Sequence, residues 1–236
     1  DKHSVGGIPA NRTTPIVVSI VAAAGLIIPK TSSRSITSPS GTADRMEILA
    51  PVEHDVKDIK RIVKKAGGCL VWGGAVDLAP ADDLFIKIEH PLSFDPLLLP
   101  SVMSKKKVVG AKFVVIDIPT GTEKIKTKED GEKLAALFKA VGKNLGMKVE
   151  CALTRGNQPI GSAIGPALEA KEALSNIMRK TFSPDLIDKA TSLAGITLKM
   201  SGKGNKEMAK KIIMSGLAEK KLRQIIISNI YAYYAI

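Results

Sequence analysis

Apolar positions in this sequence follow two spacings, one typical of helices and the other of buried strands. Over Asp55–Ala66 they recur every three or four residues, which predicts an amphipathic helix, and Gly67 directly after it predicts the helix end. Helical spacing returns over Glu132–Leu145, and Pro166 is typical of the first turn of a further helix. Short continuous apolar runs predict buried strands at Cys69–Trp72, Lys112–Ile118 and Met147–Leu153.

This alternation predicts an α/β fold, with a mixed central sheet flanked by helices on both faces. Residues 81–108 hold helical runs and no clear strand, so we expect part of a small helical lobe inserted there. Residues 1–80 and 109–221 then form the two parts of the α/β domain. Residues 222–236 are an apolar tail for which the pattern supports no assignment.

Charge and cysteine usage narrow the class of protein. The 236 residues include 35 Lys and Arg against 23 Asp and Glu, a net charge of +12, which favours an anionic partner. Cys69 and Cys151 sit in apolar runs, which favours buried thiols in a reducing cytoplasm over a disulfide-bonded secreted fold. The longest apolar stretch, Ile16–Ile28, is too short to span a membrane and lacks the flanks of a signal peptide.

The segment Lys30–Glu47 (KTSSRSITSPSGTADRME) is the strongest candidate for binding chemistry. Hydroxyl side chains crowd around Arg34, and Asp44 is a candidate N-cap of the helix that follows. Hydroxyls, backbone N–H groups and a guanidinium are the donors that a phosphate needs. A serine- and threonine-rich surface loop is the alternative interpretation.

Three further segments carry weaker signals. Lys2, His3 and Ser4 precede a Gly6–Gly7 pair that permits close approach of a ligand to the backbone, although a tight turn gives the same pattern. Ser101 and Lys105 lie four residues apart and share a helix face, or else belong to a solvated charge run. The loop 156–165 (GNQPIGSAIG) matches neither a P-loop nor a dinucleotide fingerprint.

No metal site or catalytic triad is predicted. His3 has no second His or Cys at ligand spacing, and His54 and His90 do not supply one. The basic stretch Lys203–Arg223 has apolar residues at helical spacing, which is more typical of a core helix than of a nucleic-acid surface.

At DKHSVGG and KTSSRSITSPSGTAD the sequence resembles the thymidine phosphorylase and AMP phosphorylase family. LVWGGAVDLAPADD, SVMSKKK, FVVIDIPTGT and NQPIGSAIGPALEA agree in the same order, over about residues 1 to 220. The form SSRSITSPSGTAD is closer to the archaeal AMP phosphorylase branch, since bacterial thymidine phosphorylases have a glycine-rich segment there. The resemblance begins at the phosphate loop, so we expect the family's central α/β domain and half of its helical lobe.

The resemblance implies phosphorolysis, in which phosphate attacks C1′ of a ribose and expels the base. For the AMP branch the products are adenine and ribose 1,5-bisphosphate. Asp95 matches the proton donor to the leaving base. The positions that match phosphate ligands are Lys2, Ser4, Thr14 (or Thr13), Ser32 and Thr42. The positions that match nucleotide-binding residues are Gly7, Ser33, Arg34, Ser35, Ile36, Thr37, Ser38, Thr42, Ser101, Lys105 and Lys124 (or Lys126).

Two departures from the family pattern bear on the base site. His90 stands where many members have an arginine that grips the base, and the spacing from Asp95 to Ser101 is about two residues short. The resemblance also implies a cytoplasmic homodimer or higher homo-oligomer that needs phosphate as co-substrate, with no cofactor, metal, membrane or nucleic acid.

Three alternatives remain open at this point. The first is a thymidine or pyrimidine-nucleoside phosphorylase, with the same phosphate loop but no site for a 5′-phosphate. The second is a phosphoribosyltransferase, which would need pyrophosphate and Mg²⁺, although no acidic metal-binding cluster is evident. The third is a non-catalytic module that binds RNA or DNA through its charge; the scarcity of aromatics among the basic residues counts against it.

Overall fold

The computed structural model describes residues 1–5, 12–34, 40–76, 84, 98–122 and 124–234. Two parallel sheets form its centre. One has the order β1–β4–β5, from Lys2–Ser4, Phe113–Thr120 and Lys148–Arg155. The other pairs β2 (Ile28–Ser32) with β3 (Gly68–Trp72). The predicted α/β class is confirmed, but every pairing among the described strands is parallel, so the single mixed sheet of the prediction is replaced by two parallel ones.

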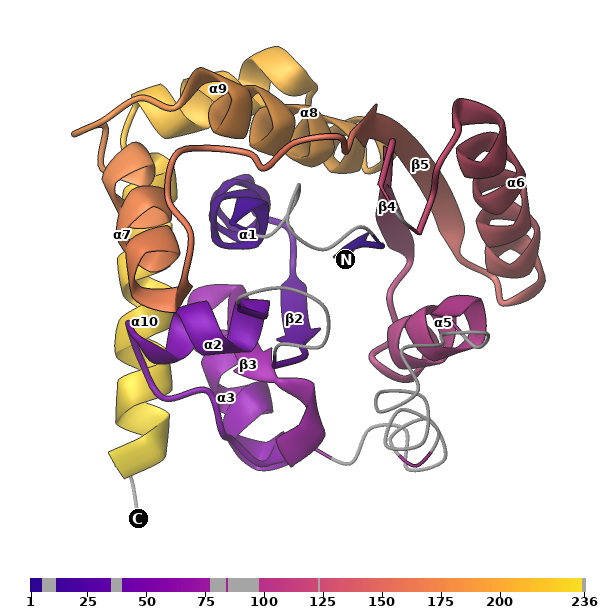
Figure 1. Ribbon diagram of the computed structural model, residues 1–236. Coiled ribbons are helices and arrows are strands. Elements are labelled where there is room, and N and C mark those ends of the chain that lie inside the picture. Colours follow the sequence, from indigo (N-terminus) through magenta and orange to yellow (C-terminus); the bar gives the residue numbers. More distant parts are fainter. Residues whose placement is uncertain (6–11, 35–39, 77–83, 85–97, 123, 235–236) are drawn as a thin grey trace.

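Helix α1 (Thr13–Ala23) is the centre of the larger core (Figure 1). Its side chains Ile16, Val17 and Ile20 are fully buried, since other helices surround it on several sides. The helices that pack against it are α7 (Pro166–Ile177), α8 (Pro184–Met200), α9 (Lys206–Met214) and α10 (Leu217–Tyr234). The apolar run from Ile16 to Ile28 is therefore a core helix followed by a turn and a buried strand.

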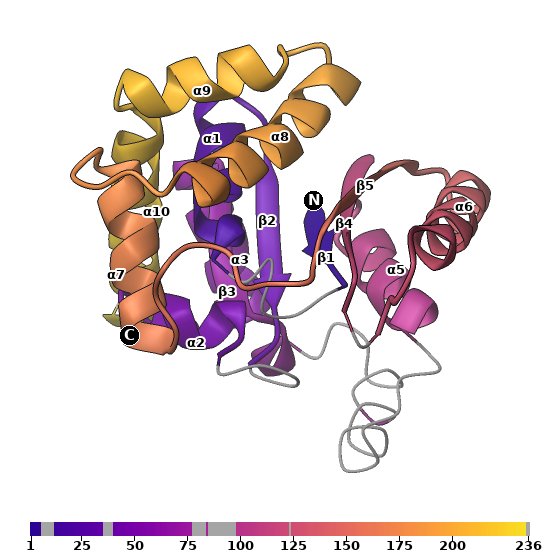
Figure 2. The same cartoon turned by 45° about the horizontal axis from the view of Figure 1, so that its top comes forward.

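Helices cover both faces of the β1–β4–β5 sheet (Figure 2). Val115 on β4 faces the core around α1, whereas Val114 and Ile116 face α6 (Lys128–Asn144) and α5 (Leu98–Val108). This alternation follows from the two-residue period of a strand. The sheet therefore lies between the core around α1 and the two helices that flank its other face.

The predicted elements appear with small shifts of their ends. Helix α3 (Val56–Ala66) begins after the N-cap Asp55 and ends at Gly67, as the pattern predicts. The sequence pattern supported no assignment for residues 222–236. In the structure this segment belongs to α10 as far as Tyr234, and α10 packs against α1 and α3. There the Asn229 amide donates to the backbone oxygens of Pro51 and Leu70, at 3.2 Å each. The basic stretch Lys203–Arg223 contributes α9 and the start of α10, whose inner faces are buried.

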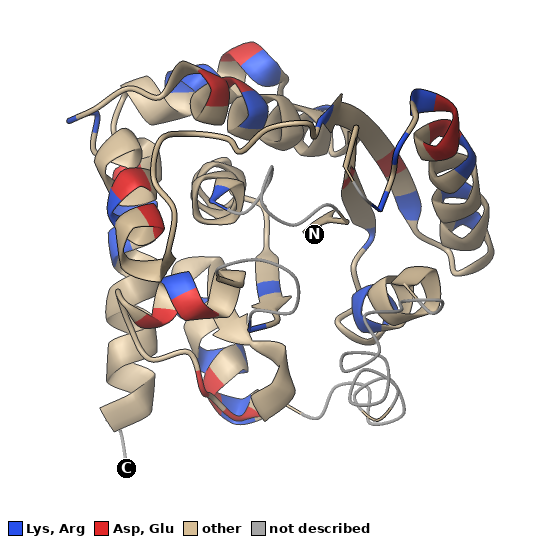
Figure 3. Ribbon diagram, in the orientation of Figure 1, with Lys and Arg blue, Asp and Glu red and all other residues tan. Residues whose placement is uncertain are grey.

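Charges of both signs occur on the outer helices (Figure 3). Helices α6, α7 and α8 each carry acidic as well as basic residues. Both cysteines are free thiols, as predicted, and burial raises the pKa of Cys69 to about 12.

Candidate functional site

Strand β1 presents Lys2 and Ser4 on the same face, because side chains two residues apart in a strand point the same way. The buried Lys2 ammonium donates to Thr13 Oγ1 at 2.9 Å and lies 3.4 Å from Thr14 Oγ1. Ser4 Oγ donates to Asp117 Oδ2 at 2.7 Å. The predicted phosphate positions Lys2, Ser4 and Thr14 thus converge where β1 meets the N-terminus of α1, and a helix N-terminus favours anions.

The Asp117 carboxylate on β4 contacts side chains from β1, β5 and α8. Besides Ser4, it accepts a hydrogen bond from Thr154 Oγ1 at 2.6 Å and lies 3.1 Å from the Lys189 ammonium of α8. The Asp117 carboxylate is fully buried. Sequence reasoning missed it, although an acidic residue inside the apolar run KFVVIDI was the available signal.

A second buried carboxylate joins three elements. Asp1 Oδ2 lies 2.7 Å from the Lys106 ammonium of α5, and Asp1 Oδ1 lies 3.8 Å from the Lys30 ammonium of β2. Lys30 shares a strand face with Ser32, because the two are two residues apart on β2. Lys106 directly follows Lys105 on α5. Asp1 therefore connects the strand that carries Lys2 to the elements that carry Ser32, Ser101 and Lys105.

Burial lowers the pKa values of Lys2, Lys30 and Lys106. Desolvation lowers the pKa of Lys2 to about 8, although the nearby Asp117 carboxylate opposes the shift. Desolvation likewise lowers the pKa of Lys106 to about 8. The pKa of Lys30 falls well below its usual range, first through burial and then through the neighbouring charge of Lys106. The site therefore holds cations that are costly to keep charged without an anion.

The pH dependence of phosphate binding tests whether the Lys2 ammonium must be charged. The charges of Asp117, Lys189, Arg45 and Lys106 act on the Lys2 ammonium, and its pKa of about 8 means that its charge is lost above that pH. The affinity for inorganic phosphate, measured by calorimetry, is therefore expected to fall steadily between pH 8 and 9.5. In the unfolded chain Lys2 keeps its proton up to about pH 10.5, so its contribution to stability rises with pH over the same window. A phosphate affinity that stays constant from pH 7 to 9.5 would contradict the assignment.

The hydroxyl-rich loop is joined to the start of α2 (Thr42–Glu47). The Ala43 N–H donates to Ser33 O at 3.3 Å. Gly41 lies so close to the backbone of Ser33 and Arg34 that a Cβ atom would fall 2.5 Å from it, so only glycine fits there. Thr42 is the first residue of this helix. The prediction of Asp44 as the N-cap is wrong: Gly41 occupies that position, and the Asp44 carboxylate accepts from the Gly41 N–H at 2.6 Å.

Arg34 is held by acidic side chains. Its guanidinium donates to both carboxylate oxygens of Glu47, at 2.6 and 2.8 Å, and to Glu53 at 3.0 Å. It also lies over the Trp72 ring, 4.8 Å from the centroid. The hydrogen bonds to Glu47 raise the pKa of Arg34. The arginine is thus fixed beside the loop, and a bound phosphate would compete with Glu47 and Glu53 for its donors.

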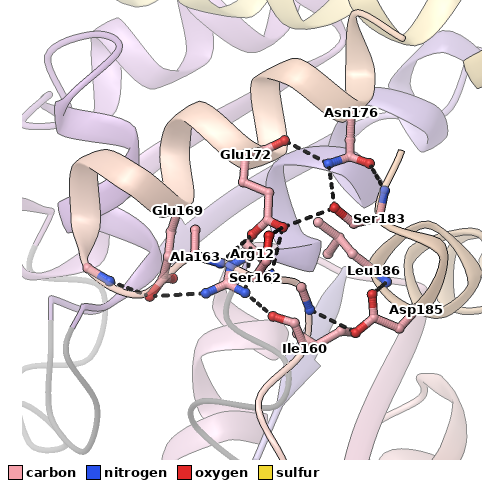
Figure 4. Close-up of polar contacts among 12 residues, drawn as sticks. Arg12, Ile160, Ser162, Ala163, Glu169, Glu172, Asn176, Ser183, Asp185 and Leu186 are labelled. Carbon is pink, nitrogen blue, oxygen red and sulfur yellow. Dashed lines mark hydrogen bonds and ion pairs between the residues drawn. The ribbon is translucent and has the colours of Figure 1, made fainter. Parts of the chain in front are cut away.

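A buried ionic network supports the two helix starts from behind (Figure 4). Arg12, directly before Thr13, lies 3.5 Å from Glu169 and 3.3 Å from Glu172. Arg45 on α2 donates to Glu169. Glu169 therefore ties the start of α1 to α2, and both arginines are almost completely buried. Because the two helix starts carry Thr13, Thr14 and Thr42, the network fixes their relative positions.

Glu172 holds the loop 156–165. Its carboxylate accepts from the backbone N–H groups of Ser162 and Ala163, at 2.8 and 3.2 Å, and from the Ser183 hydroxyl at 3.0 Å. Burial alone would raise the pKa of Glu172, but these hydrogen bonds and Arg12 lower it. A Cβ atom on Gly161 would lie 2.7 Å from the Glu172 carboxylate, so this glycine serves close packing. Sequence reasoning had assigned no role to Arg12, Arg45 or the two glutamates.

Three other predicted site residues lie on α5 or in the loop after β4. Ser101 and Lys105 both lie on α5, as predicted, and Lys124 is exposed in the loop after β4. The remaining candidates lie outside the described residues: Gly7, Ser35, Ile36, Thr37, Ser38, His90 and Asp95.

Two surface hollows are lined by other residues than Lys2, Ser4 and Thr14. One, of about 470 Å³, lies at the carboxyl ends of β4 and β5 and is lined in part by Thr120, Lys126 and Thr154. The other, of about 770 Å³, lies beside His54 and Tyr233, between α3 and α10. The convergence of buried polar groups at β1, rather than the size of a hollow, therefore marks the candidate site.

Comparison with known proteins adds independent evidence. The model of the family described as "Glycosyl transferase family, a/b domain" matches residues 1–219. The chain belongs to this family. The site described above therefore lies within the glycosyl transferase a/b domain, to which Lys2, Thr14, Ser32 and Thr42 all belong.

Proteins named AMP phosphorylase match this domain over almost its whole length. The relative from Thermococcus sibiricus is 57% identical over 96% of this chain, and that from Methanococcus vannielii is 53% identical over 97%. The matches confirm the resemblance to the archaeal AMP phosphorylases. The chain spans 46% and 47% of these two relatives, so about half the length of each lies outside the match.

A solved structure shares the fold. The anthranilate phosphoribosyltransferase TrpD from Thermus thermophilus superposes with a TM-score of 0.78, over 97% of this chain and 77% of that one. The sequence identity is 17%, so this likeness concerns the fold alone.

Two further observations describe the part of the chain that the structure covers. No three His, Cys, Asp or Glu side chains gather there into a set that could hold a metal ion. None of the helices described there is both long and apolar enough to cross a membrane.

Proposed function

We propose that the protein containing this chain catalyses phosphorolysis of nucleoside 5′-monophosphates, converting AMP and phosphate into adenine and ribose 1,5-bisphosphate. The observation that carries the proposal is the convergence of the buried Lys2 ammonium with Ser4, Thr13 and Thr14 at a helix N-terminus. Its family relatives named AMP phosphorylase, at 51–57% identity, support this reaction over that of a nucleoside phosphorylase.

The proposed step transfers the ribosyl group between two nucleophiles. A phosphate oxygen forms a bond to C1′ while the bond from C1′ to the base nitrogen breaks, and the bonding pair leaves with the base. Positive charge develops on the sugar and negative charge on the base. The phosphate dianion stabilises the positive charge on the sugar, and protonation of the base by Asp95 stabilises the negative charge on the base. The residues that hold the phosphate are Lys2, Ser4, Thr14, Ser32 and Thr42.

The roles of the nucleotide-binding positions also belong to this proposal. Backbone and hydroxyl groups of Ser33 to Ser38, with Arg34, hold the 5′-phosphate, while Ser101 and Lys105 on α5 face the base. Lys124 and His90 complete the nucleotide site. Inorganic phosphate is the co-substrate, and no further cofactor takes part.

Assembly and location complete the proposal. We assign the protein to the cytoplasm, because its two unpaired thiols suit a reducing compartment, and to a homodimer or higher homo-oligomer, after the family resemblance.

Substitution of Arg34 tests the nucleotide specificity. Arg34→Ala is expected to raise KM for AMP by one to two decades while leaving KM for adenosine nearly unchanged, because a charge-assisted contact to phosphate contributes roughly 1.5–3 kcal/mol. Steady-state kinetics on both substrates measures the split. Arg61→Ala, which removes an exposed arginine paired with Asp58, is the matched control. Equal effects on AMP and adenosine would favour the thymidine or pyrimidine-nucleoside phosphorylase alternative.

A further inference from the structure

Arg34, which the proposed function assigns to the 5′-phosphate, faces more carboxylates than it can balance. Its guanidinium donates to both carboxylate oxygens of Glu47, at 2.6 and 2.8 Å, and to Glu53 at 3.0 Å. A third carboxylate, that of Asp44, lies 3.5 Å from the guanidinium. One positive charge therefore faces three negative charges, which gives this group of four side chains a net charge of −2.

The fold brings these groups together from separate elements. Strands β2 and β3 pair with Ser32 opposite Trp72, and Arg34, two residues beyond β2, lies over the Trp72 ring at 4.8 Å from its centroid. Glu47 is the last residue of α2, and Glu53 lies in the segment before α3. The ring supports the guanidinium from one side, while the two glutamates accept hydrogen bonds from its N–H groups.

This arrangement does not suit a phosphate dianion. Both terminal nitrogens of the Arg34 guanidinium already donate to carboxylates, and a phosphate uses the same paired N–H groups. A dianion that approached Arg34 in this arrangement would also meet a net negative charge. Binding of the 5′-phosphate to Arg34 therefore requires that Glu47 and Glu53 give up hydrogen bonds to it.

The exposure of these side chains makes such an exchange feasible. The Arg34 side chain is 34% exposed, and those of Glu47 and Glu53 are 46% and 54% exposed. Ion pairs on such surfaces are weak, because water and salt screen them. Glu169 and Arg45, by contrast, form a pair that is almost fully buried. The pairs of Arg34 can therefore open for a ligand at a moderate cost in free energy.

We propose that Glu47 and Glu53 are positioning residues that hold Arg34 away from the 5′-phosphate and so limit the preference for nucleotides over nucleosides. This inference rests on the proposed function and deepens it. Without nucleotide, both glutamates occupy the guanidinium. When AMP binds, its 5′-phosphate replaces them on Arg34, and the Trp72 ring keeps the arginine beside the loop. The glutamates act through Arg34, and each makes AMP bind more weakly.

Glu47→Gln and Glu53→Gln test the proposal, because each keeps the shape of the side chain and removes its charge. Each variant is expected to bind AMP about two- to fivefold more tightly than the wild type, since the ion pair that is lost is an exposed one. Calorimetry measures the affinity for AMP and for ribose 5-phosphate, which has the 5′-phosphate but no base. KM for AMP should fall by the same factor, whereas kcat and KM for adenosine should not change.

Two further variants provide the controls. Glu219→Gln removes a carboxylate on α10 that accepts from Arg179 at 2.9 Å and from Arg223 at 3.0 Å, and it should leave the affinity for AMP unchanged. The double variant Arg34→Ala/Glu53→Gln lacks the side chain through which Glu53 acts. Its affinity for AMP should equal that of Arg34→Ala alone, because the gain from Glu53→Gln depends on the arginine.

The outcomes separate this inference from the proposed function. If either glutamine variant binds AMP as the wild type does, or more weakly, the inference is wrong and the proposed function stands. A gain in affinity that persists without Arg34 would also overturn the inference, since the glutamates would then repel the ligand directly. A wild type that binds neither AMP nor ribose 5-phosphate would overturn the proposed function as well.

Discussion

Replacing Lys2 by methionine is expected to lower kcat/KM for phosphate by about 10²–10³-fold. The ammonium is buried, it is oriented by Thr13 at 2.9 Å, and it faces the start of α1. Positioned charges in a site that excludes water stabilise developing charge far more than they would in water, and removal of one donor costs this much in enzymes that use such sites. Phosphate-dependent initial rates at saturating AMP measure the change.

The matched control is Lys112→Met, which removes a lysine just before β4. Its phosphate dependence should equal that of the wild type. Lys2→Met should remain folded, since the substitution removes a charge that is costly to bury. A folded Lys2→Met protein with normal phosphate kinetics would exclude Lys2 from the site.

Replacing Glu169 by alanine is expected to reduce the free energy of unfolding by roughly 3–5 kcal/mol. Glu169 pairs with Arg12 (Figure 4) and with Arg45. All three side chains are almost fully buried. Without Glu169, the buried positive charges of Arg12 and Arg45 lose a carboxylate partner. Removal of one partner destabilises a buried ion pair strongly, because it leaves a buried charge unbalanced. Urea denaturation followed by circular dichroism measures the change.

An exposed glutamate provides the comparison. Glu207 pairs with Lys210 at 3.4 Å on the surface of α9, and Glu207→Ala should cost about 1 kcal/mol or less. If the two substitutions cost the same, the network around Glu169 does not stabilise the fold as described. Since Glu169 connects α1 to α2, its loss should also weaken phosphate binding in protein that remains folded.

The spacing of apolar residues predicts local elements well and their assembly less well. Helix α3 appears with the expected N-cap and glycine stop, because both signals are local to the sequence. The division of the strands between two sheets depends on which strands pair, as in β1 with β4, and no local pattern encodes that choice. The tail also lacked a local signal: its burial comes from contacts with α1 and α3, distant in sequence.

Some candidate site residues could be predicted from the sequence, and others could not. The resemblance pointed to Lys2, Ser4 and Thr14, and the structure brings them to one place. Lys30, Lys106, Asp117 and the glutamates of α7 were missed, because their importance lies in pairings across the fold. A charged residue inside an apolar run, as in IIPK or VVIDI, is a usable signal for such positions.

Phosphate-dependent release of base from a panel of substrates tests the central claim most directly. AMP, CMP, UMP, thymidine and uridine are each incubated with the protein, with and without inorganic phosphate, and free base is quantified by chromatography. We expect base to be released from the 5′-monophosphates only when phosphate is present, together with ribose 1,5-bisphosphate in equal amount. Release from thymidine or uridine instead, or release that does not depend on phosphate, would contradict it.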